Sequence, residues 1–132
     1  MRYILDTNII SYVVRNPHGN VAKRLARVGT SNICTSIIVA AELRYGAKKR
    51  GSVALSAQLE AVLGRLEIIP FEEPADTTYA VLRTELERAG KPIGANDLLI
   101  AAHALALSCI LVTDNEKEFV RVPHLKLENW LR

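Results

Sequence analysis

Two aspartates, Asp6 and Asp114, each stand just beyond a short apolar segment, within the sequences LDTN (residues 5–8) and VTDN (residues 112–115). A carboxylate in such a place can bind a divalent cation. It can also cap the helix that follows, because aspartate is a favoured N-cap residue. If the two apolar segments are neighbouring strands of a parallel sheet, both carboxylates lie at its carboxyl edge, where such sheets carry their sites.

Two further acidic residues, Asp97 and Glu42, lie on apolar helix faces. Asp97 is in the first turn of an expected helix that is apolar almost all round, which predicts burial. The helix dipole stabilises a first-turn carboxylate, but a buried one needs a partner or a cation, and no basic residue is near it in sequence. Glu42 comes four residues after Ile38 and three before Tyr45, within the apolar stripe of its helix. The alternatives for Glu42 are a tertiary salt bridge and a partly exposed stripe edge.

Four carboxylates drawn together repel one another, so protons or a divalent cation must offset their charge. Ligands that are all oxygen favour Mg²⁺ or Mn²⁺ over Zn²⁺, which prefers histidine and cysteine. A hard cation with open positions activates a bound water and stabilises charge on phosphate oxygens. This set therefore predicts metal-dependent hydrolysis of phosphodiesters, and it leaves open whether one ion or two take part.

The elements that must position these residues alternate between strand and helix. Short apolar segments predict strands at residues 3–5, 32–35, 67–71, 110–112 and 125–127. Periodic segments predict helices ending near residues 15, 51, 65, 89 and 108, with a further helix carrying Val21, Leu25 and Val28. Thr7 or Asn8 is expected to cap the first helix, and Ser36 the third. The alternation predicts an α/β/α sandwich with a short, mainly parallel central sheet.

Composition bounds the class of protein. The chain has 132 residues, 49% of them hydrophobic and 23% charged, which predicts one folded domain over residues 1–132 rather than disorder. We do not expect the N-terminal segment to be a signal peptide, because Asp6 and Asn8 interrupt its apolar run too early. The longest nearly apolar stretch, residues 98–110, is too short to cross a bilayer. We expect a cytoplasmic protein with no membrane contact, and its net charge of +3 is compatible with a polyanionic partner.

Other reactive side chains have simpler explanations. Cys34 and Cys109 are far apart along the sequence, and each has apolar neighbours. We therefore expect them to be core thiols of a protein in a reducing compartment. His103, on the apolar helix, is expected to be a core histidine rather than a general base. The basic run at residues 48–50, with Arg44, could face phosphates or could be a solvated helix end. Trp130 is expected to anchor the tail in the core or at a dimer surface.

The acidic residues occur within motifs that together resemble the PIN-domain family, and within it the VapC-like toxins of toxin–antitoxin pairs. The matching segments are LDTN (5–8), AELRYG (41–46), PIG (92–94) leading to DLLIA (97–101), VTDN (112–115), and Glu118-Phe119 through ENW (128–130). Each motif is short, but four in order at these spacings are specific, and the resemblance extends over nearly the whole chain.

The resemblance implies a PIN-like fold and an Mg²⁺- or Mn²⁺-dependent endoribonuclease. It implies a metal-binding, catalytic set: Asp6, Glu42, Asp97 and Asp114. Many VapC-like chains have asparagine where this one has Asp114. It implies further residues that position ligands or substrate: Thr7, Asn8, Asn115 and the outer acid Glu118. It also implies a homodimer, a cognate antitoxin and an RNA substrate that is often a tRNA.

Two rival interpretations remain. A phosphoaspartate protein also places an aspartate after a strand, but a phosphatase of that kind needs a second aspartate where Asn8 stands, and the acidic pair and lysine of a receiver are not evident. No GxxxxGK[ST] or GxGxxG motif supports a nucleotide-binding fold. The second rival is a non-catalytic domain that only binds RNA or a partner protein. The intact set of four acids weighs against it.

Overall fold

The computed structural model describes residues 2–131. It consists of five strands, seven α-helices and one 3-10 turn over those residues. In chain order these are β1 (Tyr3–Leu5), α1 (Thr7–Arg15), α2 (Asn20–Val28), the 3-10 turn (Thr30–Asn32), β2 (Ile33–Ser36), α3 (Ile37–Arg50), α4 (Val53–Leu63), β3 (Glu67–Ile69), α5 (Ala75–Arg88), α6 (Ala95–Leu107), β4 (Ile110–Val112), α7 (Glu116–Phe119) and β5 (Leu127–Glu128).

The five strands form one parallel sheet in the order β3-β2-β1-β4-β5. β1 lies beside β4 with Leu5 opposite Val112, and the backbone N–H of Asp6 donates to the carbonyl of Val112 at 2.9 Å. The chains that leave β1 and β4 therefore emerge together at the carboxyl edge. The neighbouring strands required by the sequence argument are confirmed.

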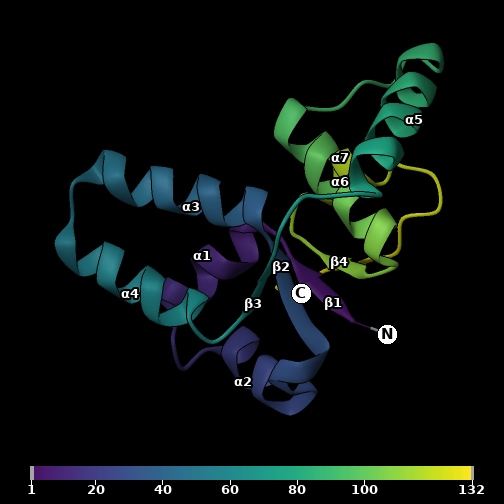
Figure 1. Cartoon of the computed structure of the whole chain (residues 1–132). Helices are drawn as coiled ribbons and strands as arrows, with labels where there is room; N and C mark the ends of the chain where they lie inside the picture. The colour runs from purple at the N-terminus through teal and green to yellow at the C-terminus, as the bar shows by residue number, and fades with distance from the viewer. Residues whose placement is uncertain (1, 132) are drawn as a thin grey trace.

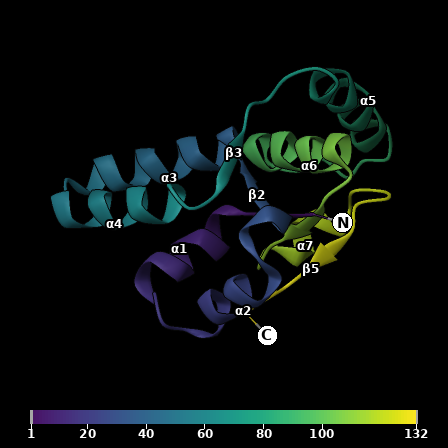
Figure 2. The same cartoon turned by 60° about the horizontal axis from the view of Figure 1, so that its bottom comes forward.

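Helices cover both faces of this sheet (Figures 1 and 2). Figure 2 shows the strands between α5 and α6 on one side and α1 and α2 on the other. α3 and α4 run side by side and extend beyond the sheet, and α1 packs against both. The predicted three-layer α/β/α sandwich is confirmed, and here the sheet is wholly parallel.

Local capping explains where two of the helices begin. Ser36 caps α3 as predicted, its hydroxyl accepting from the backbone N–H of Ile38 at 3.0 Å. The prediction that Thr7 or Asn8 caps α1 is wrong: Asp6 is the cap, its Oδ1 accepting from the Thr7 N–H at 2.8 Å. The helix begins one residue earlier than expected because Asp6 already has the extended backbone of a cap, at φ −81° and ψ 168°.

Other elements also differ from the prediction. β2 is Ile33–Ser36 rather than residues 32–35, and the 3-10 turn before it was not predicted. β3 ends at Ile69 because Pro70, which follows, has no N–H to continue the ladder. β5 is Leu127–Glu128 rather than residues 125–127, since Leu127 pairs with Leu111 of β4. The short helix α7 was not predicted: four residues are too few to show helical periodicity.

The core explains several side chains that could have been functional. Cys34 and Cys109 are buried and unbridged, as predicted. His103 is 1% exposed, and its Nδ1 lies 2.8 Å from the Ser36 hydroxyl. Trp130 is buried against Tyr3 and Arg24, which confirms that it anchors the tail in the core. Among residues 2–131, no helix is long and apolar enough to cross a membrane.

Candidate active site

The four predicted carboxylates line one open pocket of about 570 Å³ at the carboxyl edge of the sheet. The same pocket is lined by five other residues: Thr7, Asn8, Ser11, Arg15 and Asn115. Three of those five, Thr7, Asn8 and Asn115, were predicted as positioning residues. The fold thus brings together seven of the eight predicted site residues, and only Glu118 lies outside the lining.

Asp6 is held rigidly at the end of β1. It is 4% exposed, and besides capping α1 it accepts, through Oδ2, a 2.7 Å hydrogen bond from the Thr113 hydroxyl. Burial raises the pKa of this carboxyl, while the bonds from Thr113 and Thr7 act in the opposite direction. Asp6 therefore serves as a helix cap and as one wall of the pocket at once.

Asp97 lies in the first turn of α6 and faces the other carboxylates. Its Oδ2 accepts from the Asn115 amide at 3.2 Å. The pKa of Asp97 is raised to about 6, first by burial and then by the negative charges of Asp6, Glu118 and Glu42. The carboxylate thus has acidic neighbours and an amide donor, but no cation among residues 2–131 that stabilises its ionised form.

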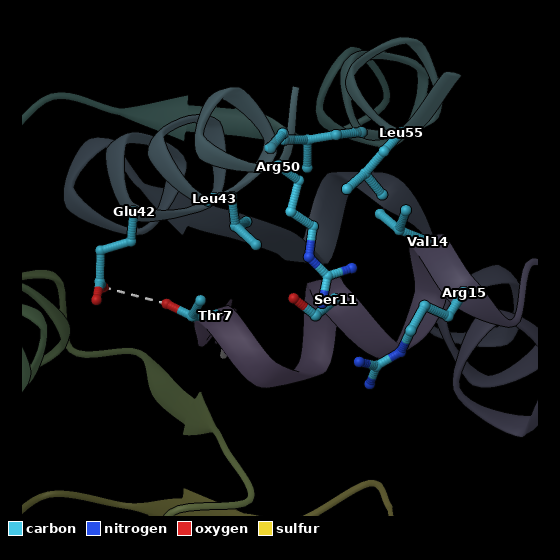
Figure 3. Close-up of a pocket in the computed structure, with 11 residues that line it drawn as sticks. Thr7, Ser11, Val14, Arg15, Glu42, Leu43, Arg50 and Leu55 are labelled. Carbon is cyan, nitrogen blue, oxygen red and sulfur yellow. Dashed lines mark hydrogen bonds between the residues drawn. The ribbon is translucent and has the colours of Figure 1, made fainter. Parts of the chain in front are cut away.

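Glu42 reaches the pocket from the middle of α3. Its Oε1 accepts a 3.1 Å hydrogen bond from the Thr7 hydroxyl at the start of α1 (Figure 3). The alternative of a tertiary salt bridge is not realised, since within the described chain Glu42 has no ion pair. The other alternative, a partly exposed stripe edge, is confirmed: Glu42 is half-buried and lies beside the buried face of α3, which is made of Val39, Ala40, Leu43 and Ala47.

Asp114 is the most exposed of the four. Its Oδ1 accepts from the Asn129 amide at 2.9 Å, and its backbone N–H donates to Asn8 Oδ1 at 3.3 Å. The capping alternative fails for Asp114, because the N-cap of α7 is Asn115 and makes no side-chain cap bond. The Asp114 side chain is instead oriented from the C-terminal segment.

Glu118 does not line the pocket but contacts the loop that precedes α6. Its Oε1 accepts from the backbone N–H of Gly94 at 2.9 Å, just before α6. Arg121, near it in sequence, donates to the carbonyl of Pro92 at 3.0 Å. The α7 segment therefore fixes the loop that starts α6, and with it the position of Asp97.

Sequence reasoning missed two residues that orient the carboxylates, Thr113 and Asn129. Thr113 is fully buried, donates to Asp6 and accepts from the Asn115 N–H at 2.9 Å. Both residues stood inside motifs already singled out, VTDN and ENW. Their polar side chains beside apolar strands were the available signal.

The donor set fits a hard divalent cation. Every polar group on the pocket wall except Arg15 and the two amide nitrogens offers oxygen, and Mg²⁺ prefers oxygen and keeps several of its waters, using one or two carboxylates together with substrate phosphates. Within residues 2–131 no three acidic, histidine or cysteine side chains are grouped closely enough to enclose a metal ion by themselves. The pocket suits an open site completed by water and substrate.

Comparison with known proteins extends this picture. The family model described as "PIN domain" matches residues 3–125. "Ribonuclease VapC2" of Rickettsia felis is 46% identical over 132 residues, with 98% of each chain covered. "tRNA(fMet)-specific endonuclease VapC" of Salmonella typhimurium is 34% identical, again with 98% of each covered. The crystal structure of VapBC2 from Rickettsia felis bound to a promoter DNA fragment superposes with a TM-score of 0.90 at 45% identity, covering 98% of this chain and 99% of that one.

Proposed function

The chain belongs to the PIN-domain family and is a ribonuclease of the VapC kind, and we propose that it hydrolyses RNA at the pocket bounded by Asp6, Glu42, Asp97 and Asp114. The observation that carries this assignment is the state of Asp97. Its carboxyl faces Asp6 and Glu42, and its pKa is raised to about 6 without a neighbouring cation. Carboxylates held together in this way are suited to a divalent ion, and the ion would remove their repulsion.

Divalent-metal dependence is general among PIN-domain ribonucleases, and we propose Mg²⁺ or Mn²⁺ here. When bound, such an ion supplies an activated water and offsets the charge that develops on the phosphate. The four carboxylates would hold it. Thr113 and Asn129 keep Asp6 and Asp114 in place, and Asn115 does the same for Asp97. Thr7 orients Glu42.

We infer that the substrate is RNA, and tRNA in particular, because a relative of full-length similarity is named for a tRNA. The reaction then takes place in the cytoplasm, where the RNA is. The partner is a cognate antitoxin, since closely similar chains are found in VapBC complexes. We also propose a homodimer. Two exposed apolar side chains, Val81 on α5 and Val120 just beyond α7, support this.

Metal titration separates this proposal from a non-catalytic binding domain. Mn²⁺ binding to the wild-type protein and to Asp6→Asn can be followed by calorimetry or by the spin resonance of the free ion. We expect binding at millimolar levels or below for the wild type and a loss of at least tenfold for the variant. If Asp6→Asn altered stability but neither Mn²⁺ affinity nor cleavage, the cluster would be structural only.

A further inference from the structure

A second pocket adjoins the carboxylates along α1. Its volume is about 260 Å³, and it lies between α1, α3 and α4 (Figure 3). Four residues line this pocket and the carboxylate pocket alike: Thr7, Ser11, Arg15 and Glu42. The two hollows are therefore parts of one continuous surface, with α1 as its shared wall.

Two arginines stand on this surface. Figure 3 shows Arg50 extending from the end of α3 toward α1 and the Ser11 side chain, and Arg15 projecting from the last turn of α1. Among the described residues, 2–131, they are the only cationic ones that line either pocket. Over residues 2–131, neither guanidinium makes an ion pair or a side-chain hydrogen bond, and both residues are exposed.

Two other cations of this basic region, Arg44 and Lys49, contact other side chains. Arg44 is bound to Glu60 of α4 by two hydrogen bonds, each of 3.0 Å, and the Lys49 ammonium lies over the ring of Tyr45 at 6.0 Å. Of the cations expected to form a phosphate-facing patch, Arg50 is the one that reaches the pocket surface. Arg44 cannot do so without breaking its bidentate ion pair.

The negative charge of the carboxylate pocket explains why an RNA substrate would need cations such as Arg15 and Arg50 beside it. The carboxylate pocket is strongly acidic, so it repels the polyanion whose bond it is proposed to cut. A bound metal ion would relieve this repulsion at the scissile phosphate, but flanking phosphates need other cations. Arginine is well suited to them, because its planar guanidinium donates two parallel hydrogen bonds to a phosphate.

The spacing along α1 fits a strand that continues past the site. Thr7, Ser11 and Arg15 are four residues apart, so they share one face of the helix. The face is about 12 Å long at 1.5 Å per residue, and a nucleic-acid strand carries a phosphate about every 3.4 Å of its axis. The hydroxyl and guanidinium donors on this face therefore extend away from the carboxylates over a distance that matches a few nucleotides.

We propose that Arg15 and Arg50 form a phosphate-binding subsite that holds the RNA backbone beside the cleavage position. The proposal rests on the ribonuclease function above, and it adds residues that bind substrate without taking part in bond cleavage. The floor of the second pocket is apolar, with Leu43, Leu55 and Leu59, and could instead receive a segment of the protein partner. The test below distinguishes these occupants.

The experiment uses fluorescein-labelled total bacterial tRNA as the probe, with binding followed by anisotropy in EDTA so that nothing is cut. Arg15→Gln and Arg50→Gln are compared with wild type and with Arg27→Gln, a control arginine that is exposed on α2 and lines neither pocket. We expect each pocket variant to bind about tenfold more weakly, with the slope of log K against log salt reduced by about 0.7. Arg27→Gln should match wild type.

Steady-state cleavage in Mn²⁺ completes the test. The pocket variants should raise KM with kcat nearly unchanged, and Arg15→Lys should recover part of the loss. Wild-type affinity and salt slope in both variants would overturn the subsite, as would an equal loss in Arg27→Gln. Weakened antitoxin binding with unchanged tRNA binding would assign the groove to the protein partner instead. A wild type that binds tRNA but never cuts it would overturn the proposed function.

Discussion

Replacing Asp97 with asparagine should stabilise the metal-free protein at neutral pH. The pKa of Asp97 rises from its ordinary 3.8 to about 6 on folding, so the native state holds this proton more tightly than the unfolded chain does. Stability therefore falls as pH rises from about 4 to above 6, and the full cost is present at pH 7. The asparagine side chain carries no charge and avoids that cost.

The size of the effect follows from the pKa. The rise corresponds to about 3 kcal/mol if taken in full. The Asp97 side chain is partly exposed, so solvent screening reduces the gain to roughly 1–2 kcal/mol. For a chain of this length that is an increase in Tm of roughly 5 °C. At pH 4, where Asp97 is largely protonated in the native state and about half protonated in the unfolded chain, most of the difference should be lost, and it should vanish at still lower pH.

Thermal unfolding in EDTA at pH 7 and pH 4 measures this directly. Asp76→Asn is the matched control, because Asp76 also lies in the first turn of a helix, α5, but is exposed. It should lose a dipole interaction and be destabilised by about 0.5 kcal/mol. Saturating Mn²⁺ should stabilise the wild type by about 2–3 kcal/mol and Asp97→Asn far less. A loss of stability in Asp97→Asn at pH 7 would refute the electrostatic reasoning.

Four other predictions concern the surroundings of the site. Glu118→Gln keeps the acceptor for the Gly94 N–H but removes a negative charge that raises the pKa of Asp97. The acidic limb of the cleavage pH profile should therefore move to lower pH. Glu118→Ala also removes the acceptor and should lower kcat. Thr113→Val leaves Asp6 Oδ2 without its buried donor, and should cost about 1–3 kcal/mol in denaturant unfolding and lower kcat about tenfold or more. His103→Ala should lower the free energy of unfolding by roughly 2 kcal/mol or more, while kcat in folded protein stays near wild type. Sedimentation at micromolar concentration should show a dimer, and a monomer would contradict it.

Much of the fold could be predicted because its strands are short apolar runs bounded by polar residues. β1 and β4 lie where the sequence placed them, Tyr3–Leu5 and Ile110–Val112. At least one helix lies between each strand and the next as far as β4. This alternation favoured a parallel sheet. α7 was missed because four residues carry no period, and the start of β5 was misjudged because pairing with β4 sets it.

The acidic residues of the candidate site could be predicted from the sequence, but the hydrogen bonds that orient them could not. Asp97 could be predicted because a carboxylate on an apolar helix is unusual, and Glu42 because it stands between the apolar residues Ile38 and Tyr45 in sequence, although it lies at the partly exposed edge of its helix. By contrast, Thr113 meets Asp6 across 107 positions of sequence, and Asn129 meets Asp114 through the path of the C-terminal segment. Such contacts depend on the register of the sheet, which a local pattern does not contain.

The most direct test of the central claim is cleavage of total tRNA by the purified protein. Wild type and Asp97→Asn are incubated with Mg²⁺ or Mn²⁺ and with EDTA, and the fragments are mapped at their ends. We predict metal-dependent cutting at defined positions by the wild type, lost in EDTA and reduced by orders of magnitude in Asp97→Asn. Equal cutting by wild type and variant, or cutting that survives EDTA, would contradict a metal-dependent carboxylate site.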